Sequence, residues 1–171
     1  MSTNVTVIIP IRNEERFIAR TLDALLSQDY SREFLEIQVI DGMSTDRTCE
    51  IVSQYCQRFP YIAWHKNPNC WSSSARNIGI RESKGELILI VDGHCELTDR
   101  QYLNKLVAAF QRSGADCLGR PQPLDVSHAT PIQRAIAAAR QSPLGHHPDS
   151  FIYSTTERPA PAKPAAKVIS P

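Results

Sequence analysis

Short apolar runs alternate along the chain with longer segments in which apolar residues recur at helical spacing. The first run, Val5 to Ile9, is rich in β-branched residues and predicts a buried strand that ends at Pro10. Beyond it, apolar residues such as Leu22 and Leu25 recur at a helical period, which predicts a helix over Glu14 to Ser27. The chain therefore begins with a strand, a loop and a helix.

The same alternation repeats along the chain. Further strands are predicted at Glu36 to Ile40, Tyr61 to His65, Leu87 to Val91 and Ala115 to Leu118. Further helices are predicted at Thr45 to Phe59, at Ser72 to Ile80, behind a capping box of Thr98 and Gln101, and at Ile132 to Gln141 behind Thr130, Pro131 and Gln133. Strands that alternate with helices predict an α/β fold, a Rossmann-like and mainly parallel sheet with right-handed connections and helices on both faces.

The periodic pattern ends well before the C-terminus. From residue 158 onward the sequence is mostly Pro, Ala and Lys, and its prolines prevent regular pairing. We therefore expect one domain over residues 1–157 and a disordered tail over residues 158–171. The hydrophobic share of 42% is sufficient for one core.

Charge and cysteine usage exclude several classes of protein. Nineteen basic residues against eighteen acidic residues give a net charge of +1, so no general field attracts nucleic acid or an anionic membrane. The five cysteines are odd in number and never spaced as C-x-x-C, which argues against a disulfide framework and a zinc finger and predicts a cytoplasmic protein. The longest apolar run, Leu87 to Val91, is far shorter than the roughly 20 residues that span a bilayer.

Polar residues are concentrated directly after the predicted strands. Because ligands of open parallel sheets bind beyond the carboxyl ends of the strands, these loops are the candidate site. The informative loops are Pro10 to Glu15, Asp41 to Asp46, Ser74 to Gly79 at a helix start, and Asp92 to Glu96. Their charged side chains are expected to meet at one edge of the sheet.

The last of these loops carries the pattern of a metal site. Asp92 and His94, separated by Gly93, can offer an oxygen and an imidazole nitrogen to one divalent ion. Such an ion neutralises a diphosphate leaving group, and Arg76 can add a second positive charge. The alternative is that Asp-Gly makes a simple turn and His94 bonds locally.

The other loops have two interpretations each. Asp41 can accept a hydrogen bond from a base edge such as the imide N–H of uracil, or it can belong to a turn in which Ser44 and Asp46 cap the next helix. The residues Arg12 to Glu15 can bind a ligand or form a solvated helix start. The indole of Trp71 is interpreted as a packing group rather than a stacking platform.

Four motifs resemble family 2 glycosyltransferases in order and spacing: VIIPIRNEE, VIDGMSTD, ARNIGI and VDGH, within residues 4–153. The second is similar to bacterial enzymes of exopolysaccharide synthesis, such as that of succinoglycan. The resemblance implies a GT-A fold, a nucleotide diphosphate sugar donor such as a UDP-sugar, and Mg²⁺ or Mn²⁺. It also implies that Asp41 binds the base, Arg76 lies at the diphosphate, and Asp92 is the first acid of a D-x-D motif. It further implies inverting transfer to a polysaccharide or lipid-linked acceptor, at the cytoplasmic face of the membrane in full-length relatives.

The chain departs from that family pattern in two places. His94 stands where the family commonly has aspartate, although polypeptide N-acetylgalactosaminyltransferases have a similar D-x-H pair that binds manganese. Inverting transfer also needs a carboxylate base, and neither Asp149 nor Glu157 lies in a recognisable motif, so no catalytic residue is assigned. Two hypotheses follow: a transferase, or a truncated chain that lacks the acceptor half and only binds the nucleotide sugar.

The predicted site can be stated residue by residue. The predicted metal ligands are Asp92 and His94. The predicted nucleotide-sugar-binding residues are Pro10, Arg12, Asn13, Glu14, Asp41, Ser44, Asp46, Arg76 and Asp92. A dinucleotide-dependent oxidoreductase is excluded, because the seven glycines form no glycine-rich phosphate loop.

Overall fold

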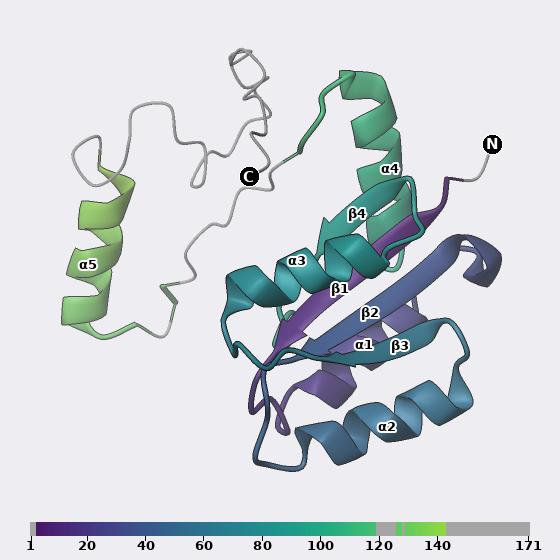
Figure 1. The fold of residues 1–171 in the computed structure, drawn as a ribbon. Coiled ribbons are helices and arrows are strands. Elements are labelled where there is room, and N and C mark those ends of the chain that lie inside the picture. The colour runs from purple at the N-terminus through teal and green to yellow at the C-terminus, as the bar shows by residue number, and fades with distance from the viewer. Residues whose placement is uncertain (1–2, 119–125, 128, 143–171) are drawn as a thin grey trace, which may run out of the picture. The chain divides into compact units, whose positions relative to one another are not determined.

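The computed structural model describes residues 3–118, 126–127 and 129–142 (Figure 1). The chain divides into two compact units, Met1–Ala109 and Phe110–Pro171. The first unit contains the whole sheet. The expected domain boundary at residue 157 and the expected tail over residues 158–171 lie outside the described residues.

A parallel sheet of four strands organises the first unit. The strands are β1 (Val5–Ile11), β2 (Leu35–Asp41), β3 (Ile62–Lys66) and β4 (Leu87–Ile90), arranged in the order β3-β2-β1-β4. Every pairing between them is parallel. The chain moves outward from β1 to β3 and then returns to the other side of β1, so the strand order reverses between β1 and β4. Such a switch point opens a crevice at the carboxyl ends of the two strands.

Helices cover both faces of this sheet, which confirms the predicted α/β fold. The helices of the first unit are α1 (Ile18–Leu26), α2 (Thr48–Arg58) and α3 (Ser72–Glu82), with a 3₁₀ turn at Arg32–Phe34 and with the start of α4 (Tyr102–Ser113). The helix α5 (Pro131–Gln141) belongs to the second unit. Figure 1 shows α1 and α2 on one side of the sheet and α3 on the other. This arrangement follows from right-handed crossovers, because α3 connects strands in the direction opposite to α1 and α2.

The alternation of side chains along β1 supplies both cores. Val7 and Ile9 point into the larger core, with Leu22 of α1 and Val52 of α2. Ile8 points to the other face, where it packs with Ile40 and with Ala75 of α3. Because a strand presents successive side chains to opposite faces, a strand buried on both faces reads as a continuous apolar run.

Pro10 does not end the first strand, contrary to the prediction. β1 continues through Ile11, and Pro10 pairs in register with Ile40 of β2. The backbone of Ile8 faces β4, since its carbonyl accepts from the N–H of Val91. Pro10 is two residues further along the strand, so its backbone groups point to the same side as those of Ile8. That side is the region beyond the end of β4, where the missing N–H of Pro10 removes no hydrogen bond of the sheet.

Two other local predictions are wrong. Ala115 to Leu118 is not a strand, and the segment follows Gly114, whose φ of +62° turns the chain. The helix α4 begins at Tyr102 without a Thr98 cap, because the carboxylate of Asp99 accepts from the N–H of Gln101 instead. In the second unit, the capping box of Thr130 and Gln133 is confirmed, with proline in the first turn of α5.

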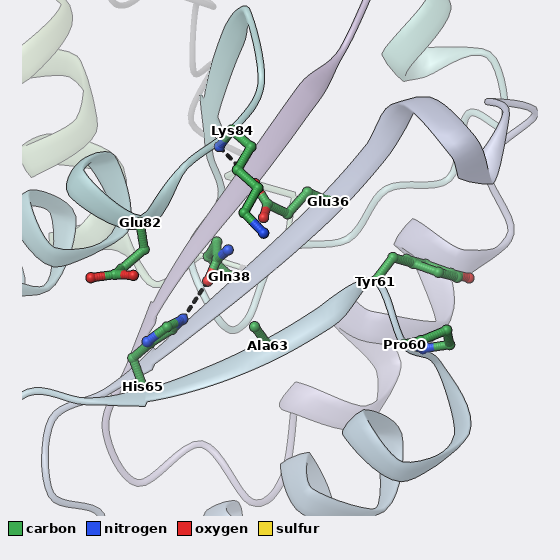
Figure 2. Close-up of a pocket in the computed structure, with 8 residues that line it drawn as sticks. All are labelled: Glu36, Gln38, Pro60, Tyr61, Ala63, His65, Glu82 and Lys84. Atoms are coloured by element: carbon green, nitrogen blue, oxygen red, sulfur yellow. Dashed lines mark hydrogen bonds between the residues drawn. The ribbon is translucent and has the colours of Figure 1, made fainter.

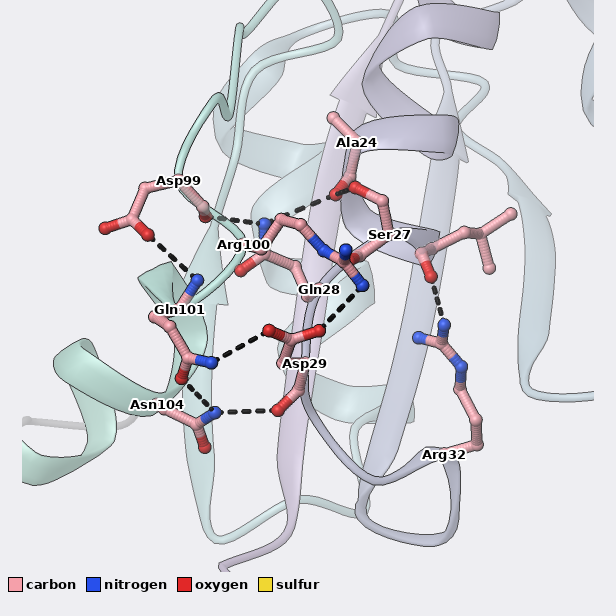
Figure 3. A network of polar contacts seen from close by, with 10 residues as sticks. Ala24, Ser27, Gln28, Asp29, Arg32, Asp99, Arg100, Gln101 and Asn104 are labelled. Carbon is pink, nitrogen blue, oxygen red and sulfur yellow. Dashed lines mark hydrogen bonds and ion pairs between the residues drawn. The ribbon is translucent and has the colours of Figure 1, made fainter.

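A polar network fixes the segment that leads from the end of β4 to α4 (Figure 3). The carboxylate of Asp29, just after α1, accepts from Arg100 at 2.9 Å and from Gln101 at 2.8 Å. The side chain of Gln28 donates to the carbonyl of Asp99 and accepts from the buried N–H of Leu103. Both ends of the loop after β4 are therefore held, one by the sheet and one by this network.

None of the helices in the described ranges is long and apolar enough to cross a membrane. The five cysteines all lie within those ranges, and no two of them form a disulfide.

Tyr55 of α2 ties that helix to α1. Its hydroxyl donates to the carboxylate of Asp23 at 2.7 Å. Burial, and then the hydrogen bond to Asp23 and the charge of that carboxylate, raise the pKa of Tyr55 from 10.0 to about 12. Folding therefore favours the neutral phenol.

The free energy of unfolding should accordingly fall as the pH rises from 10.0 to about 12, because the unfolded chain loses the Tyr55 proton first. Below that window the contribution of Tyr55 is fully present. In Tyr55→Phe this part of the pH dependence should be absent, and urea unfolding at a series of alkaline pH values measures it. Identical slopes for both proteins would contradict the assignment.

Candidate functional site

The loops after β1 and β2 are joined into one unit at the carboxyl edge of the sheet. The N–H of Asn13 donates to the hydroxyl of Ser44 at 2.8 Å, and the side-chain oxygen of Asn13 accepts from the N–H of Thr45 at 2.9 Å. The N–H of Glu15 donates to the carboxylate of Asp46 at 3.2 Å. These bonds bring together three of the predicted site residues, Asn13, Ser44 and Asp46.

Left-handed backbone conformations gather in the loops at this edge. Asn13 has a φ of 56°, Met43 a φ of 60° and Cys70 a φ of 60°, and these residues follow β1, β2 and β3 respectively. Among the described residues they are the only non-glycine residues with positive φ. Such conformations cost on the order of 1–3 kcal/mol each and cluster at functional sites. The edge therefore has the strain that is typical of a binding site.

Asp41 is buried and directed into its own loop. Only 2% of the residue is exposed, and its carboxylate accepts from the N–H and the hydroxyl of Ser44 and from the thiol of Cys49. Burial, followed by the hydrogen bond to Asp41, raises the pKa of the Cys49 thiol, so this thiol remains a donor. The geometry matches the turn interpretation of this loop, and a base-edge contact would have to use the remaining lone pairs of the carboxylate.

Asp46 caps α2. One of its carboxylate oxygens accepts from the N–H of Thr48 at 3.0 Å. Burial raises the pKa of Asp46, but the hydrogen bonds from Thr48 and from the Glu15 backbone outweigh that effect, so the pKa lies below its ordinary value. The carboxylate therefore stays ionised at the positive end of the helix.

The loop after β4 lies against α1 and the end of β1. The hydroxyl of Thr21 donates to the carbonyl of Gly93 at 2.9 Å and lies 3.2 Å from that of Cys95. A Cβ atom at Gly93 would lie 2.7 Å from the Cγ2 atom of Ile11, so only glycine fits this close approach. Held in this way, the loop exposes both predicted metal ligands, Asp92 and His94.

His94 is bonded to Glu14 across the switch point. Its Nδ1 atom lies 3.0 Å from the Oε1 atom of Glu14, and its ring meets that of Phe17 edge-on at 6.4 Å. Because an ionised carboxylate can only accept, Nδ1 is the donor in this pair. The Nε2 atom of His94 is left to act as a ligand.

A cavity of about 180 Å³ lies beside these loops. It is lined by Pro10, Ile11, Arg12, Glu14, Gly42, Asn67, Cys70, Trp71, Ser72 and Ala75. Three predicted site residues, Pro10, Arg12 and Glu14, are thus among its lining residues. The other six nucleotide-site residues and His94 are not, and Arg76 is exposed on α3 beside the lining residue Ala75.

Sequence reasoning missed the loop after β3. Asn67 is 1% exposed and holds the start of α3, since its side chain donates to the carbonyl of Trp71 and accepts from the hydroxyl of Ser74. Trp71 is 74% exposed, so its interpretation as a packing group is wrong. Inspecting the carboxyl end of every predicted strand, β3 included, would have found this loop.

A second hollow, of about 350 Å³, lies away from this edge (Figure 2). It is formed on the face of β2 and β3 near the end of α3, and its polar groups bond to one another. Glu36 accepts from the hydroxyl of Thr6 and the N–H of Lys84, and Gln38 bonds to His65 at 2.5 Å. The bond from Lys84 holds the α3–β4 connection to β2, and the other two bonds join neighbouring strands.

The donor set after β4 fits a divalent cation that is shared with a ligand. Among the described residues, no group of three or more His, Cys, Asp and Glu side chains is placed to hold a metal by itself. Asp92 and His94 offer one carboxylate and one imidazole, both exposed. Mg²⁺ is commonly held by one or two carboxylates together with substrate phosphates and water, so two protein ligands are sufficient for such a site.

The fold defines the class of protein: an α/β domain of the GT-A type. A mannosyltransferase, PcManGT from Pyrobaculum calidifontis, solved with GDP-Man and Mn²⁺, matches 73% of this chain and 36% of its own at a TM-score of 0.64 and 27% identity. S. aureus TarS 1–349, solved with UDP, matches 70% of this chain and 38% of its own at a TM-score of 0.57 and 25% identity.

The sequence gives the family. The model of glycosyl transferase family 2 matches residues 6–156, and the chain belongs to this family. The glycosyltransferase AglE of Haloferax volcanii is 34% identical over 116 residues, which are 67% of this chain and 38% of AglE. The chain therefore spans less than two fifths of the length of that relative and of the two solved structures.

Proposed function

We propose that the carboxyl edge of the sheet binds a nucleotide diphosphate sugar, most simply a UDP-sugar, together with Mg²⁺ or Mn²⁺. Asp92 and His94 hold the cation, which neutralises the diphosphate. The observation that carries the proposal is the bond between the imidazole of His94 and the carboxylate of Glu14 at the switch point, two residues after Asp92. Two solved relatives support it, since PcManGT was solved in complex with GDP-Man and Mn²⁺ and TarS 1–349 in complex with UDP.

The cavity provides the place for the nucleoside. Pro10, Arg12 and the exposed indole of Trp71 line it, and an indole face can stack on a base. Asp41 lies in the loop region that also holds Ser44, Asp46 and Asn13. Its carboxylate offers its remaining lone pairs to a base edge. Arg76 adds a permanent positive charge on the diphosphate side.

Sugar transfer follows from membership of the family. The proposal is an inverting transfer, on the cytoplasmic side of the membrane, to a polysaccharide or lipid-linked acceptor. That reaction needs a carboxylate that takes the proton of the acceptor hydroxyl. None of the described residues is assigned that role, so a chain that binds the donor without transferring it is the second candidate.

Calorimetry with UDP and UMP tests the proposed donor site. In Mn²⁺ the chain should bind UDP at least about tenfold more tightly than UMP, and EDTA should reduce this difference to the part that Arg76 supplies, because the diphosphate engages the cation. Equal binding of the two nucleotides in Mn²⁺ would refute the site. Release of labelled sugar from UDP-sugars then separates a transferase from a binding-only chain.

A further inference from the structure

We infer that Glu14 is a positioning residue that sets the tautomer and the orientation of His94, so that Nε2 is the atom presented to the cation. The inference rests on the proposed metal site. It gives Glu14 a role different from the sugar-nucleotide contact that the sequence predicts.

The Glu14 backbone is fixed from several directions. Its N–H donates to the hydroxyl of Thr48 at 2.8 Å, and its carbonyl accepts from the N–H groups of Phe17 and Ile18 at 2.9 Å each. Glu14 is therefore tied to the start of α2 and of α1 together. Its carboxylate projects from a rigid point, as positioning of a second residue requires.

The side chain of Glu14 passes close to Gly93 where it approaches His94. A Cβ atom at Gly93 would lie 3.2 Å from the Cγ atom of Glu14 and 2.7 Å from the Cγ2 atom of Ile11. Because glycine has no Cβ atom, Gly93 leaves room for the contact between Glu14 and His94 and also allows the turn. The side chain of Glu14 is 18% exposed, whereas that of His94 is 58% exposed. The carboxylate is therefore the more buried partner, and the imidazole is the more exposed one.

A carboxylate that accepts from Nδ1–H has a defined effect on a histidine ligand. It fixes the proton on Nδ1 and leaves the Nε2 lone pair available. The edge-on contact with Phe17 limits rotation of the ring from a second side. Glu14 and Phe17 together therefore hold His94 in one tautomer and one orientation before any ligand binds.

The test compares Glu14→Ala, Glu14→Gln and the wild-type chain. Glu14→Ala should weaken Mn²⁺ binding in the presence of UDP by about 10- to 100-fold, as loss of a carboxylate behind a ligating histidine does. Glu14→Gln should lose less, because its amide oxygen still accepts from Nδ1–H. Electron paramagnetic resonance of free Mn²⁺ measures the affinity.

A second readout needs no metal. The ¹⁵N spectrum of the neutral His94 ring should show the proton on Nδ1 in the wild type and in Glu14→Gln, and a shift toward Nε2 in Glu14→Ala. Glu96→Ala is the matched control, since it removes a carboxylate two positions from His94 whose ion pair, within the described part of the chain, is with the exposed Arg20. It should change the Mn²⁺ affinity by less than about fivefold.

The outcomes separate this inference from the proposed function. An unchanged tautomer in Glu14→Ala overturns the positioning role. Equal losses of Mn²⁺ affinity in the Gln and Ala variants also overturn it, because they would make the Glu14 carboxylate a ligand in its own right. A wild-type chain that shows the expected tautomer but binds no Mn²⁺ with UDP refutes the proposed metal site instead.

Discussion

Asp92→Asn should weaken the binding of UDP in Mn²⁺ by about 100-fold or more. This exceeds the effect expected from substituting Glu14, which acts on the cation through His94. Asp92 follows β4 directly, and its residue is exposed. Its backbone carbonyl accepts from the N–H of Cys95, while no bond to the described residues involves its carboxylate. The substitution therefore removes the negative oxygen donor without removing a contact that supports the fold.

Calorimetry of UDP with and without Mn²⁺ measures the effect of Asp92→Asn. Glu96→Gln is the control, because it removes the same charge from the same loop and breaks only an exposed ion pair with Arg20. The control should bind like the wild type, and both variants should unfold at the urea concentration of the wild type. Retention of Mn²⁺-dependent UDP binding in Asp92→Asn would show that the cation is held elsewhere.

Gly79→Ala should destabilise the first unit by about 2 kcal/mol, as overpacking of a filled core does. A Cβ atom at Gly79 would lie 2.5 Å from the Cγ2 and 2.9 Å from the Cγ1 atom of Ile8. Ile8 of β1 is fully buried where it packs against Ala75 of α3, so these atoms cannot move into solvent. The cost should exceed the gain of about 1 kcal/mol from the better helix propensity of alanine.

A double-mutant cycle identifies the clash as the cause. Ile8→Ala removes the crowded Cγ1 and Cγ2 atoms together with Cδ1, which would lie 3.0 Å from the new Cβ atom. Alone it should cost about 2–5 kcal/mol through the cavity it leaves. The double variant should be more stable than the sum of the two effects predicts, by about 0.5–3 kcal/mol, because the new methyl group fills part of that cavity. Urea unfolding gives the four free energies, and Arg81→Ala, exposed on the same helix, is the control. Additive effects would rule out a direct clash.

Local patterns were sufficient to predict most of the elements. Strands β1 to β4 and the five helices lie where the apolar periods of two and 3.6 residues predict them. The errors occurred where a local signal depended on its neighbours. Pro10 was expected to end β1. The pairing of β1 with β4 stops at Ile8, however, so the missing N–H of Pro10 removes no hydrogen bond between these strands. The segment from Ala115 to Leu118 was predicted to be a strand but is not one in the structure.

The candidate site was predicted unevenly. Asp92 and His94 could be proposed as metal ligands from the sequence because the motif itself is local, with one residue between them. The loop holding Trp71 was missed, since a single indole carries no pattern that distinguishes burial from exposure. For Asp41, spacing placed the residue at a strand end, but only the fold shows its carboxylate directed toward Ser44 and Cys49.

The sequence by itself determined the strand and helix alternation, the family and the positions of the charged loops, because these depend on residues close together along the chain. The tertiary structure alone decided which loops meet. The strand order β3-β2-β1-β4 places the loop after β4 beside the loop after β1, so that Glu14 bonds to His94 across 80 positions of sequence. Such a contact forms only when the crossover through α3 returns the chain past β1, and no local pattern encodes that return.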